Sequence, residues 1–480
     1  MNYGVIRQVL SWILCTEGVM MLLPCLISLV YGEDEGVVYF ALALIAIVVG
    51  YAAARKKVQN RAIYQREGFV AVGLSWVLMS LYGALPFVLT GEITRYIDAL
   101  FEIVSGFTTT GSSILQDVEA LSRTSLFWRS FSHWIGGMGV LVFILMMMPM
   151  TSGGTQMNLM KAESPGPDVS KFVPRVRNTA IVLYRIYLAM TLLMILALTC
   201  TGMYWFDTLC ITFGTAGTGG FGILNDSCGS YTPIQQWIIT IGMIAFGVNF
   251  SFYYLILIRK AKEALHLEEV RAYLAIILVT GFAIAWQLRD TFTSWEETLR
   301  ASFFQVGSII TTTGYSTVDF DAWPSFSKGL LVLLMIIGAC AGSTGGGVKV
   351  SRVLLVYKSI HLELQQILNP HGIQKIRMDG NVVDNKMMNS IYVFFITYFM
   401  IFALSMATIS LDNFNFESNF TAVAATLNNI GPGIGQVGPT QNFGHYSHLS
   451  KGVLIFDMLA GRLELMPMLI LFYPRTWKRN

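Results

Sequence analysis

Long apolar runs, separated by short polar segments, dominate the chain. Ten of them are long enough to cross ~30 Å of hydrocarbon at ~1.5 Å per helical residue. The expected spans are residues 9–31, 37–54, 68–90, 126–149, 179–201, 233–258, 271–289, 326–357, 388–411 and 452–473. This pattern predicts an all-α integral membrane protein with ten transmembrane helices.

Shorter amphipathic runs lie between the later spans and are too brief to cross a bilayer. They predict short helices over residues 94–107, 204–215, 295–310 and 415–427. Each is followed by a Thr/Gly loop and then by another span, so each helix and loop must enter the membrane and return. Non-helical backbone is tolerated at that depth where protein or a water-filled path surrounds it.

The four loops repeat one motif. Residues 108–112 read Thr-Thr-Thr-Gly-Ser and residues 311–315 read Thr-Thr-Thr-Gly-Tyr, with looser copies at 216–220 and 428–432. A recurrence at intervals of roughly 100 residues is typical of internal structural repeats. We therefore expect two leading helices and then four pseudo-fourfold helix–pore loop–helix repeats around one central pore. The expected boundaries are 1–67 for the leading helices and 68–178, 179–270, 271–386 and 387–480 for the repeats.

The composition of the loops suits a dehydrated cation. Backbone carbonyls can replace the hydration shell of potassium, glycine permits the backbone angles that turn carbonyls inward, and threonine adds a hydroxyl group. A close-packing turn would explain one Thr/Gly run, but it explains four in register with four hairpins poorly. The expected potassium-binding residues are Thr110, Gly111, Thr218, Gly219, Thr313, Gly314, Ile430 and Gly431.

The short helices are expected to point their C-terminal ends at the pore centre, where their dipoles favour a cation. Acidic residues near their outer ends would stabilise the helix starts and concentrate cations. Ser294 with Glu297 also fits a capping box at the third helix. The acids are Asp98, Glu102, Asp207, Glu296, Glu297 and Glu417.

A glycine-rich stretch at 338–349 interrupts an apolar region that is longer than one span requires. Glycine is costly inside a helix, so we expect a broken helix with an intramembrane loop below the filter. Our hypothesis is that this loop is the gate, and the alternative is a kinked helix with a packing role. The candidate gating residues are Gly342, Ser343, Thr344, Gly345, Gly346, Gly347 and Lys349.

Arg462 lies inside the last span, where an ionisable residue usually faces a cavity or a partner. We expect it to act with the gate as an electrostatic barrier below the filter, with Glu464 as its possible partner. A purely structural Arg462–Glu464 pair is the alternative. Packing or interfacial roles are expected for the other ionisable residues near spans: Glu17, Arg129, His133, Arg185 and Lys451.

Composition and charge agree with a membrane protein. The 480 residues are 54% hydrophobic and 13% charged, against about 25% charged in soluble domains. Most Lys and Arg fall near the termini and in segments 55–67, 151–178, 259–271 and 349–386. These segments share one side if ten spans alternate, which predicts cytoplasmic termini. The sequence contains no carboxylate pair, HExxH or nucleophile with its base, so we expect no enzyme.

These motifs, together with the run His133-Trp-Ile-Gly-Gly-Met-Gly139, resemble the Trk/Ktr/HKT superfamily of potassium transporters. The two leading spans make the chain most similar to the bacterial TrkH-type potassium uptake subunits. The resemblance implies a multi-pass protein of the bacterial plasma (inner) membrane, potassium at the filter glycines Gly111, Gly219, Gly314 and Gly431, and a homodimer. It also implies that 338–349 is the gating loop and that Arg462 is a pore arginine.

The resemblance further implies docking on a cytoplasmic, TrkA-like ring of regulatory subunits that bind NAD or ATP. The chain has no GxGxxG opening a soluble βαβ unit, so nucleotide control would come from that partner. No covalent cofactor is expected. Gated, channel-like potassium uptake is the favoured function. A potassium symporter coupled to sodium or protons, and a non-conducting membrane sensor of the same architecture, are the alternatives.

Overall fold

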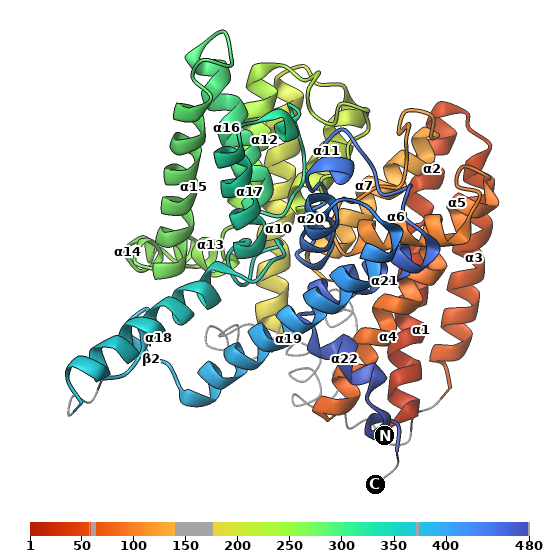
Figure 1. Ribbon diagram of the computed structural model, residues 1–480. Coiled ribbons are helices and arrows are strands. Elements are labelled where there is room, and N and C mark those ends of the chain that lie inside the picture. The colour runs from red at the N-terminus through yellow and green to blue at the C-terminus, as the bar shows by residue number, and fades with distance from the viewer. Residues whose placement is uncertain (57, 59–63, 140–175, 371–373, 479–480) are drawn as a thin grey trace.

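The structure, a computed structural model, describes residues 1–56, 58, 64–139, 176–370 and 374–478 and is almost entirely helical (Figure 1). Two leading segments stand at one edge: α1 (Tyr3–Met20), which continues as α2 (Leu22–Tyr31), and α3 (Glu35–Ala54), which packs along α1. The predicted fold class, an all-α membrane protein, is confirmed.

The rest of the chain repeats the order of a long helix, a short helix, a loop and a second helix. The long helices are α4 (Gln65–Gly83) with its extension α5 (Leu85–Leu89), α10 (Val176–Cys200), α15 (Glu268–Gln287) and α19 (Asn385–Ile409). The short helices are α6 (Tyr96–Phe107), α11 (Trp205–Gly217), α16 (Trp295–Ile310) and α20 (Phe416–Leu427). The second helices are α7 (Arg123–Gly137), α12 (Pro233–Phe246), α17 (Ser325–Ile337) and α21 (His448–Arg462).

The short helices begin within two residues of their predicted starts, and two have side-chain caps. Asn415 caps α20, and the Ser294 hydroxyl accepts the Glu297 N–H at 3.1 Å at the start of α16. The predicted capping box is incomplete, because the Glu297 carboxylate accepts the Thr293 hydroxyl at 2.8 Å. A full capping box is present instead at α12, between Thr232 and Gln235.

Among the described residues, six helical segments are long and apolar enough to cross a membrane. A seventh is the pair α12 and α13 (Phe250–Leu257), bent by 89°, with α14 (Ala261–Leu265) following. The predicted span 233–258 is therefore formed by two helices with a sharp bend between them. Asn249 causes the break, because its side chain accepts the Ser251 N–H at 2.8 Å and starts a new helix.

Two other predicted spans are also broken. The glycine-rich stretch separates α17 from α18 (Val350–Leu368), as predicted. The last span was predicted as one helix, but α21 ends at Arg462 and α22 (Met466–Phe472) follows, because Pro467 cannot continue the ladder of α21. The second half of the predicted span 126–149 and most of the basic segment 151–178 lie outside the described residues.

α18 extends away from the body and leads into a small hairpin of β1 (Arg377–Met378) and β2 (Asn381–Val382) (Figure 1). The remaining elements are single 3₁₀ turns: η2 (Phe320–Ala322), η3 (Ser410–Asp412), η4 (Gly435–Val437) and η5 (Pro474–Thr476).

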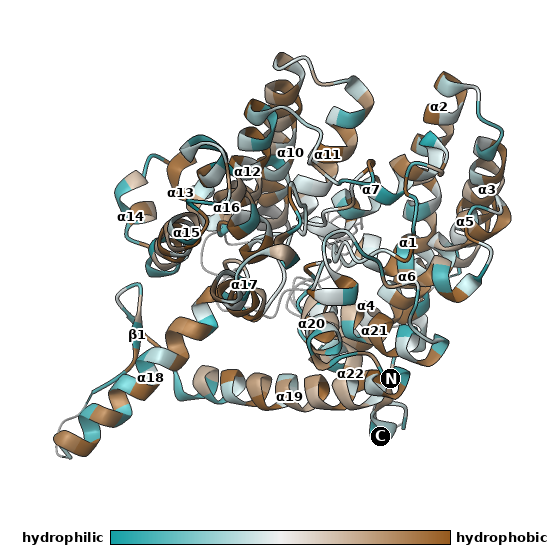
Figure 2. Ribbon diagram, turned by 45° about the horizontal axis from the view of Figure 1, so that its top comes forward, coloured by the Kyte–Doolittle hydropathy of each residue, from teal (hydrophilic) through white to brown (hydrophobic). Residues whose placement is uncertain are grey.

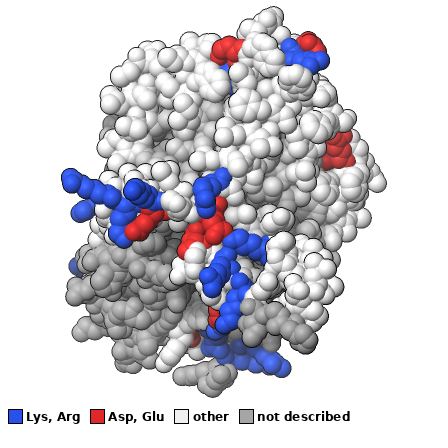
Figure 3. All heavy atoms as spheres, turned by 90° about the vertical axis from the view of Figure 1, so that its left-hand side faces the viewer, with Lys and Arg blue, Asp and Glu red and all other residues white. Residues whose placement is uncertain are grey.

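Polarity is distributed as in a membrane protein. Large apolar side chains are exposed on the peripheral helices α3, α15 and α19, where the ribbon is mostly brown (Figure 2). On the face that carries α15 and α18, charged side chains gather in the lower half, and most of the upper half is uncharged (Figure 3). Exposed basic residues of α14, the hairpin and their flanks include Arg259, Lys260, Lys262, Lys375 and Arg377.

Lys451 was expected at the membrane interface, but it is buried. Its side chain is 3% exposed, and its Nζ contacts Asp98 Oδ1 at 2.6 Å and the Gly444 carbonyl at 2.9 Å. The pair joins the first turn of α21 to the first turn of α6. It therefore fixes α21 to a short helix from the opposite end of the sequence.

We predict that Lys451→Met lowers the free energy of unfolding by about 3 kcal/mol, because it leaves the Asp98 carboxylate without its buried cation. Lys260→Met is the control: its partner Glu263 and Lys260 itself are both about half exposed, so less than about 1 kcal/mol is expected. Thermal unfolding of the purified protein in detergent measures both. Equal shifts for the two variants would contradict the structural role of the pair.

Candidate functional site: a ring of four loops

The four short helices end in the same backbone pattern. The first residue of the pattern is left-handed: Thr109 (φ 57°), Thr218 (54°), Thr312 (58°) and Asn429 (55°). The N–H of the next residue donates at 2.8 Å to the carbonyl five residues earlier, in Thr110, Gly219, Thr313 and Ile430. The third residue is a glycine with positive φ: Gly111 (82°), Gly220 (76°), Gly314 (86°) and Gly431 (106°).

This pattern corrects the predicted register of the second loop. The structural equivalent of Gly111 is Gly220, so the expected pair Thr218 and Gly219 is displaced by one residue from the pairs in the other loops. Thr218 instead occupies the left-handed position of Thr109. The sequence offers two adjacent glycines here, and the motif alone does not say which of them carries the positive φ.

The loops meet in a closed ring. A Cβ atom on any of the four positive-φ glycines would come within 3.0 Å of a carbonyl oxygen of the neighbouring loop, a separation that real Cβ atoms essentially never show. The pairs run in order around the ring: Gly111 with Gly219, Gly220 with Thr313, Gly314 with Ile430, and Gly431 with Thr110. Glycine is therefore required at each position for two reasons: the backbone has a positive φ, and a Cβ atom would clash with the neighbouring loop.

Side chains outside the ring brace the loops differently in each repeat. The hydroxyl groups of Thr108 and Thr110 lie 2.7 Å apart, as do those of Thr311 and Thr313. In the fourth loop, Asn429 donates at 2.9 Å to the Thr110 hydroxyl. Asparagine tolerates the left-handed backbone better than most residues, so it serves both the turn and this link between the last and first loops.

His133 of α7 braces the second loop. It is fully buried, with Nδ1 2.7 Å from the Gly106 carbonyl and Nε2 accepting the Phe221 N–H at 3.2 Å. Because that N–H can only donate, Nδ1 carries the hydrogen of a neutral ring. A Cβ on Gly219 would come within 3.0 Å of the imidazole. The His133 imidazole thus occupies the space that the side chain of Thr110 or Thr313 takes in the first and third loops.

Glu102 and Arg129 form a buried ion pair behind the ring. Arg129 Nε contacts Glu102 Oε1 at 2.8 Å, and Nη1 donates to the Gly222 carbonyl at 3.2 Å. Glu102 also accepts the Ile114 N–H at 2.9 Å. We had expected Glu102 at an outer helix end, attracting cations. It is instead fully buried and neutralised, and the pair holds the segments that follow the first and second loops.

The glycine-rich stretch 338–349 lies against the base of the ring. The Gly346 N–H donates to the Thr312 hydroxyl at 2.6 Å. A Cβ on Gly345 or Gly346 would come within 3.0 Å of the carbonyl oxygen of Thr311 or Asn428, respectively. The Lys349 ammonium bonds back to the Gly345 carbonyl. The structure thus brings the predicted gating residues directly beneath the third and fourth loops of the ring.

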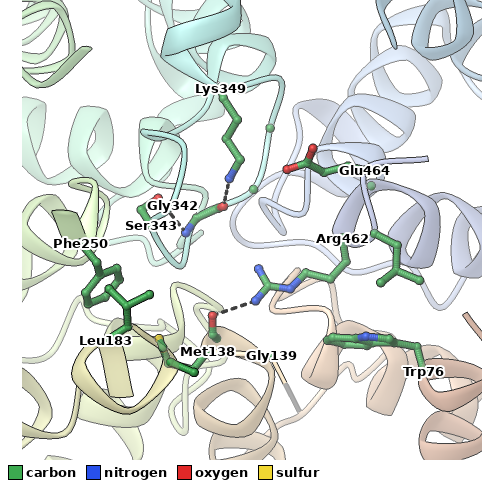
Figure 4. A pocket seen from close by; sticks show the side chains of 17 residues that line it. Trp76, Met138, Gly139, Leu183, Phe250, Gly342, Ser343, Lys349, Arg462 and Glu464 are labelled. Atoms are coloured by element: carbon green, nitrogen blue, oxygen red, sulfur yellow. Dashed lines mark hydrogen bonds between the residues drawn. The ribbon is translucent and has the colours of Figure 1, made fainter. Parts of the chain in front are cut away.

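Arg462 reaches this stretch from α21 (Figure 4). Its guanidinium donates at 2.9 Å to the Thr344 and Gly137 carbonyls, and it also contacts the Gly136 carbonyl. The ion pair of Glu464, the partner suggested for Arg462, is with Arg352. Arg462 therefore joins the glycine-rich stretch to the end of α7 through backbone oxygens.

Cavities lie on both sides of the ring. One of about 120 Å³ is lined by the positive-φ glycines Gly111, Gly220, Gly314 and Gly431 and by the segments that follow them. The other, of about 140 Å³, is lined by Arg462, Lys349 and residues of the glycine-rich stretch, with Trp76 and Phe250 in its wall (Figure 4). The ring and the stretch beneath it separate the two cavities.

Comparison with known proteins gives a consistent result. The TrkH family, described as cation transport protein, matches residues 36–479. Over 100% of both chains, the sequence is 34% identical to the Trk system potassium uptake protein TrkH of Salmonella typhimurium. It is 30% identical to the TrkG protein of Escherichia coli K12, over 99% of this chain and 98% of that one. The crystal structure of the potassium transporter TrkH from Vibrio parahaemolyticus superposes with a TM-score of 0.88, at 30% identity and 100% coverage of both chains.

We predict that Gly220→Ala destabilises the protein by several kcal/mol, because a Cβ at a positive φ would clash with the Thr313 carbonyl. Gly329→Ala in α17 is the control, since nothing lies within 4 Å of its added Cβ, and the same change should be neutral or slightly stabilising. The thermal midpoint in detergent measures both. A Gly220→Ala protein as stable as the control would contradict the ring geometry.

The role of His133 has its own test. Gly219→Thr should cost about 1–3 kcal/mol by overpacking against the imidazole. His133→Ala makes room for the new side chain, so the double variant should be more stable than the sum of the two single changes predicts. Thermal midpoints of the unmodified protein, the two single variants and the double variant complete the cycle. Strict additivity would show that the His133 imidazole does not fill the space of a threonine side chain at position 219.

Proposed function

Because this chain belongs to the TrkH family of cation transport proteins, and is therefore a potassium uptake transporter of the Trk system rather than an enzyme, we propose that potassium passes through the ring of four loops. The observation that carries this proposal is the cyclic contact of each positive-φ glycine with a carbonyl of the next loop. Four repeats of one chain, with the boundaries predicted from the sequence, would then surround a single conducting path.

The ring offers what a dehydrated cation requires. Its wall is backbone, and the carbonyls of Thr110, Gly219, Thr313 and Ile430 are set at equivalent positions by equivalent hydrogen bonds. Carbonyl oxygens at such positions can replace water around potassium. The proposed ion-binding residues are these four and the glycines Gly111, Gly220, Gly314 and Gly431. Thr218, expected among them from the sequence, becomes part of the turn that precedes them.

The four short helices support the same proposal electrostatically. Each of α6, α11, α16 and α20 leads at its C-terminus directly into the ring. The carbonyl end of a helix carries a partial negative charge, so four such ends around one point stabilise a cation without placing a carboxylate beside it. Glu102, a buried acid of α6, is paired with Arg129, so its charge is compensated.

The stretch from Gly342 to Gly347, with Lys349 and Arg462, is the proposed gate. It is packed against the ring and contains two glycines with positive φ, Gly342 and Gly347. Lys349, two residues further on, also has a positive φ of 84°. A segment held in sparsely populated backbone angles persists where its surroundings fix it. Arg462 adds a fixed positive charge in the cavity below the ring and holds the Thr344 carbonyl, which supports a role as barrier and as anchor.

Topology and partners complete the proposal. The chain would lie in the bacterial inner membrane with both termini in the cytoplasm, because the exposed basic residues gather at one end of the molecule. It would act as a homodimer on a TrkA-like ring of regulatory subunits. Nucleotide would bind to that partner, and potassium is the transported ion. The basic surface around α14 and the hairpin fits an acidic docking partner.

We predict that Gly314→Ser lowers the preference for potassium over sodium by roughly tenfold or more, the effect of ~1.4 kcal/mol at the ion site, because the Ile430 carbonyl occupies the space of the added Cβ. Purified protein in liposomes with a potassium gradient supplies the reversal potential. Gly329→Ser is the matched control. A sensor of the same architecture would conduct in neither form, and a reversal potential that shifts with external sodium or pH would favour coupled symport.

We also predict that deleting Gly345 to Gly347 raises resting potassium flux, because the deleted residues pack against the ring and bond to the Thr312 hydroxyl. Rubidium-86 uptake into the same liposomes, without any partner protein, measures it. Unchanged resting flux in a correctly folded variant would contradict the proposed gate and would favour the packing role for this stretch.

A further inference from the structure

A single buried carboxylate receives both ends of the glycine-rich stretch. Glu269, the second residue of α15, is 5% exposed. Its Oε1 atom accepts the Ala341 N–H at 2.7 Å and the Ser351 N–H at 3.0 Å. Ala341 precedes the gating residues and Ser351 follows them, so one oxygen atom bonds to both sides of the break between α17 and α18, in addition to backbone bonds such as Lys349 N–H to the Ile337 carbonyl at 2.9 Å.

The same carboxylate lies beside the break in the preceding repeat. Glu269 Oε2 is 3.5 Å from the amide of Asn249, the residue that starts α13. Two backbone hydrogen bonds join the breaks directly: Cys340 N–H to the Gly247 carbonyl at 3.1 Å, and Phe250 N–H to the Gly342 carbonyl at 3.0 Å. The first half of the stretch is therefore docked on the bend between α12 and α13, and Glu269 closes that junction.

A negative charge suits this position. Ser351 is the second residue of α18, so its N–H is one of the helix donors that have no intrahelical acceptor. A carboxylate at the N-terminus of a helix is also stabilised by the helix dipole. Without Glu269, two buried N–H groups would lose an acceptor, and an unsatisfied buried donor is costly. The docked conformation of the stretch therefore depends on this side chain more than on any exposed charge nearby.

We propose that Glu269 is a positioning residue for the gate: it holds the glycine-rich stretch in its docked, closed conformation beneath the ring. The inference rests on the proposed function, because it takes this stretch to be the gate. Glu269 does not touch the ion path. It acts through Ala341 and Ser351, and through Asn249 it couples the gate to the bend that leads to α13 and α14.

The neighbouring residue Glu268 provides a matched control. It is one position away on α15, but it pairs with Lys358 of α18 and accepts the Asp379 N–H of the hairpin at 3.0 Å. Both acids link α15 to α18, and Glu269 alone of the two contacts the glycine-rich stretch. A general weakening of the α15–α18 contact would therefore affect variants of both acids. Loss of the latch, by which we mean the Glu269 hydrogen bonds to Ala341 and Ser351, would affect only the Glu269 variants.

The experiment uses the full-length purified chain in liposomes, with rubidium-86 influx as the readout. Glu269→Ala should raise resting flux about tenfold or more, the change expected from losing a hydrogen-bond acceptor worth ~1.4 kcal/mol to the closed state. Glu269→Gln keeps the shape and one weaker acceptor oxygen, so it should give an intermediate rise, and it serves if the alanine variant does not fold. Glu268→Gln should leave the flux unchanged.

A second readout follows the stretch itself. A cysteine introduced by Ser343→Cys should react with a membrane-impermeant thiol reagent several-fold faster when combined with Glu269→Gln, and at the original rate when combined with Glu268→Gln. The potassium-to-sodium preference should be unchanged in all these variants, because the ring is intact. A merely structural role would lower thermal stability without moving either readout.

The outcomes separate the latch from the function on which it rests. If deletion of Gly345 to Gly347 raises the flux while Glu269→Ala and Glu269→Gln do not, the latch is overturned and the gate stands. Equal increases for the Glu268 and Glu269 variants also overturn it. If no variant conducts, the proposed function fails first.

Discussion

The close approach of backbone to backbone in the ring is the constraint on which the rest of the structure depends. Four glycines face four carbonyls at separations that exclude any side chain, so the helices that deliver them must be placed within fractions of an ångström. Much of the buried polar chemistry serves that placement. The Glu102–Arg129 pair and the His133 imidazole bond to backbone beside a loop, and the Asn429 amide bonds its own loop to the Met458 carbonyl of α21.

The four repeats share the backbone pattern but achieve it with different side chains. Paired threonine hydroxyls brace two loops, a histidine from a neighbouring helix braces another, and an asparagine braces the last. Since all four sit in one polypeptide, each quarter can specialise. The second helix of each repeat ends after 13 to 15 residues, with last residues Gly137, Phe246, Ile337 and Arg462. The glycine-rich stretch follows the third of these helices.

Local patterns in the sequence were sufficient to locate the helices. They were insufficient to predict the register of the second loop or the partners of the buried charged side chains. Amphipathic runs located the short helices to within two residues, because periodicity and caps are local properties. The register of the second loop could not be predicted, because Gly219 and Gly220 are both compatible with the motif and His133, 86 residues away, decides between them. Pro467 and Asn249 are residue types that mark breaks in helices, but the long apolar runs around them favoured the prediction of unbroken spans. The partners of Lys451, Glu102 and Glu269 depend on tertiary packing, which the spacing of residues along the sequence does not reveal.

The link between the first and last loops has a consequence for biosynthesis. Asn429 bonds to Thr110, and Ser112 bonds to the Gly431 carbonyl, each across 319 residues of chain. Contacts of such long sequence separation form late, because the intervening chain must first be ordered. The first three repeats must therefore remain in the bilayer without the contacts between the first and last loops until the fourth repeat has been synthesised. Premature termination within the fourth repeat, before Asn429, would leave the ring of loops open on one side, because the first loop would lack its partners Asn429 and Gly431.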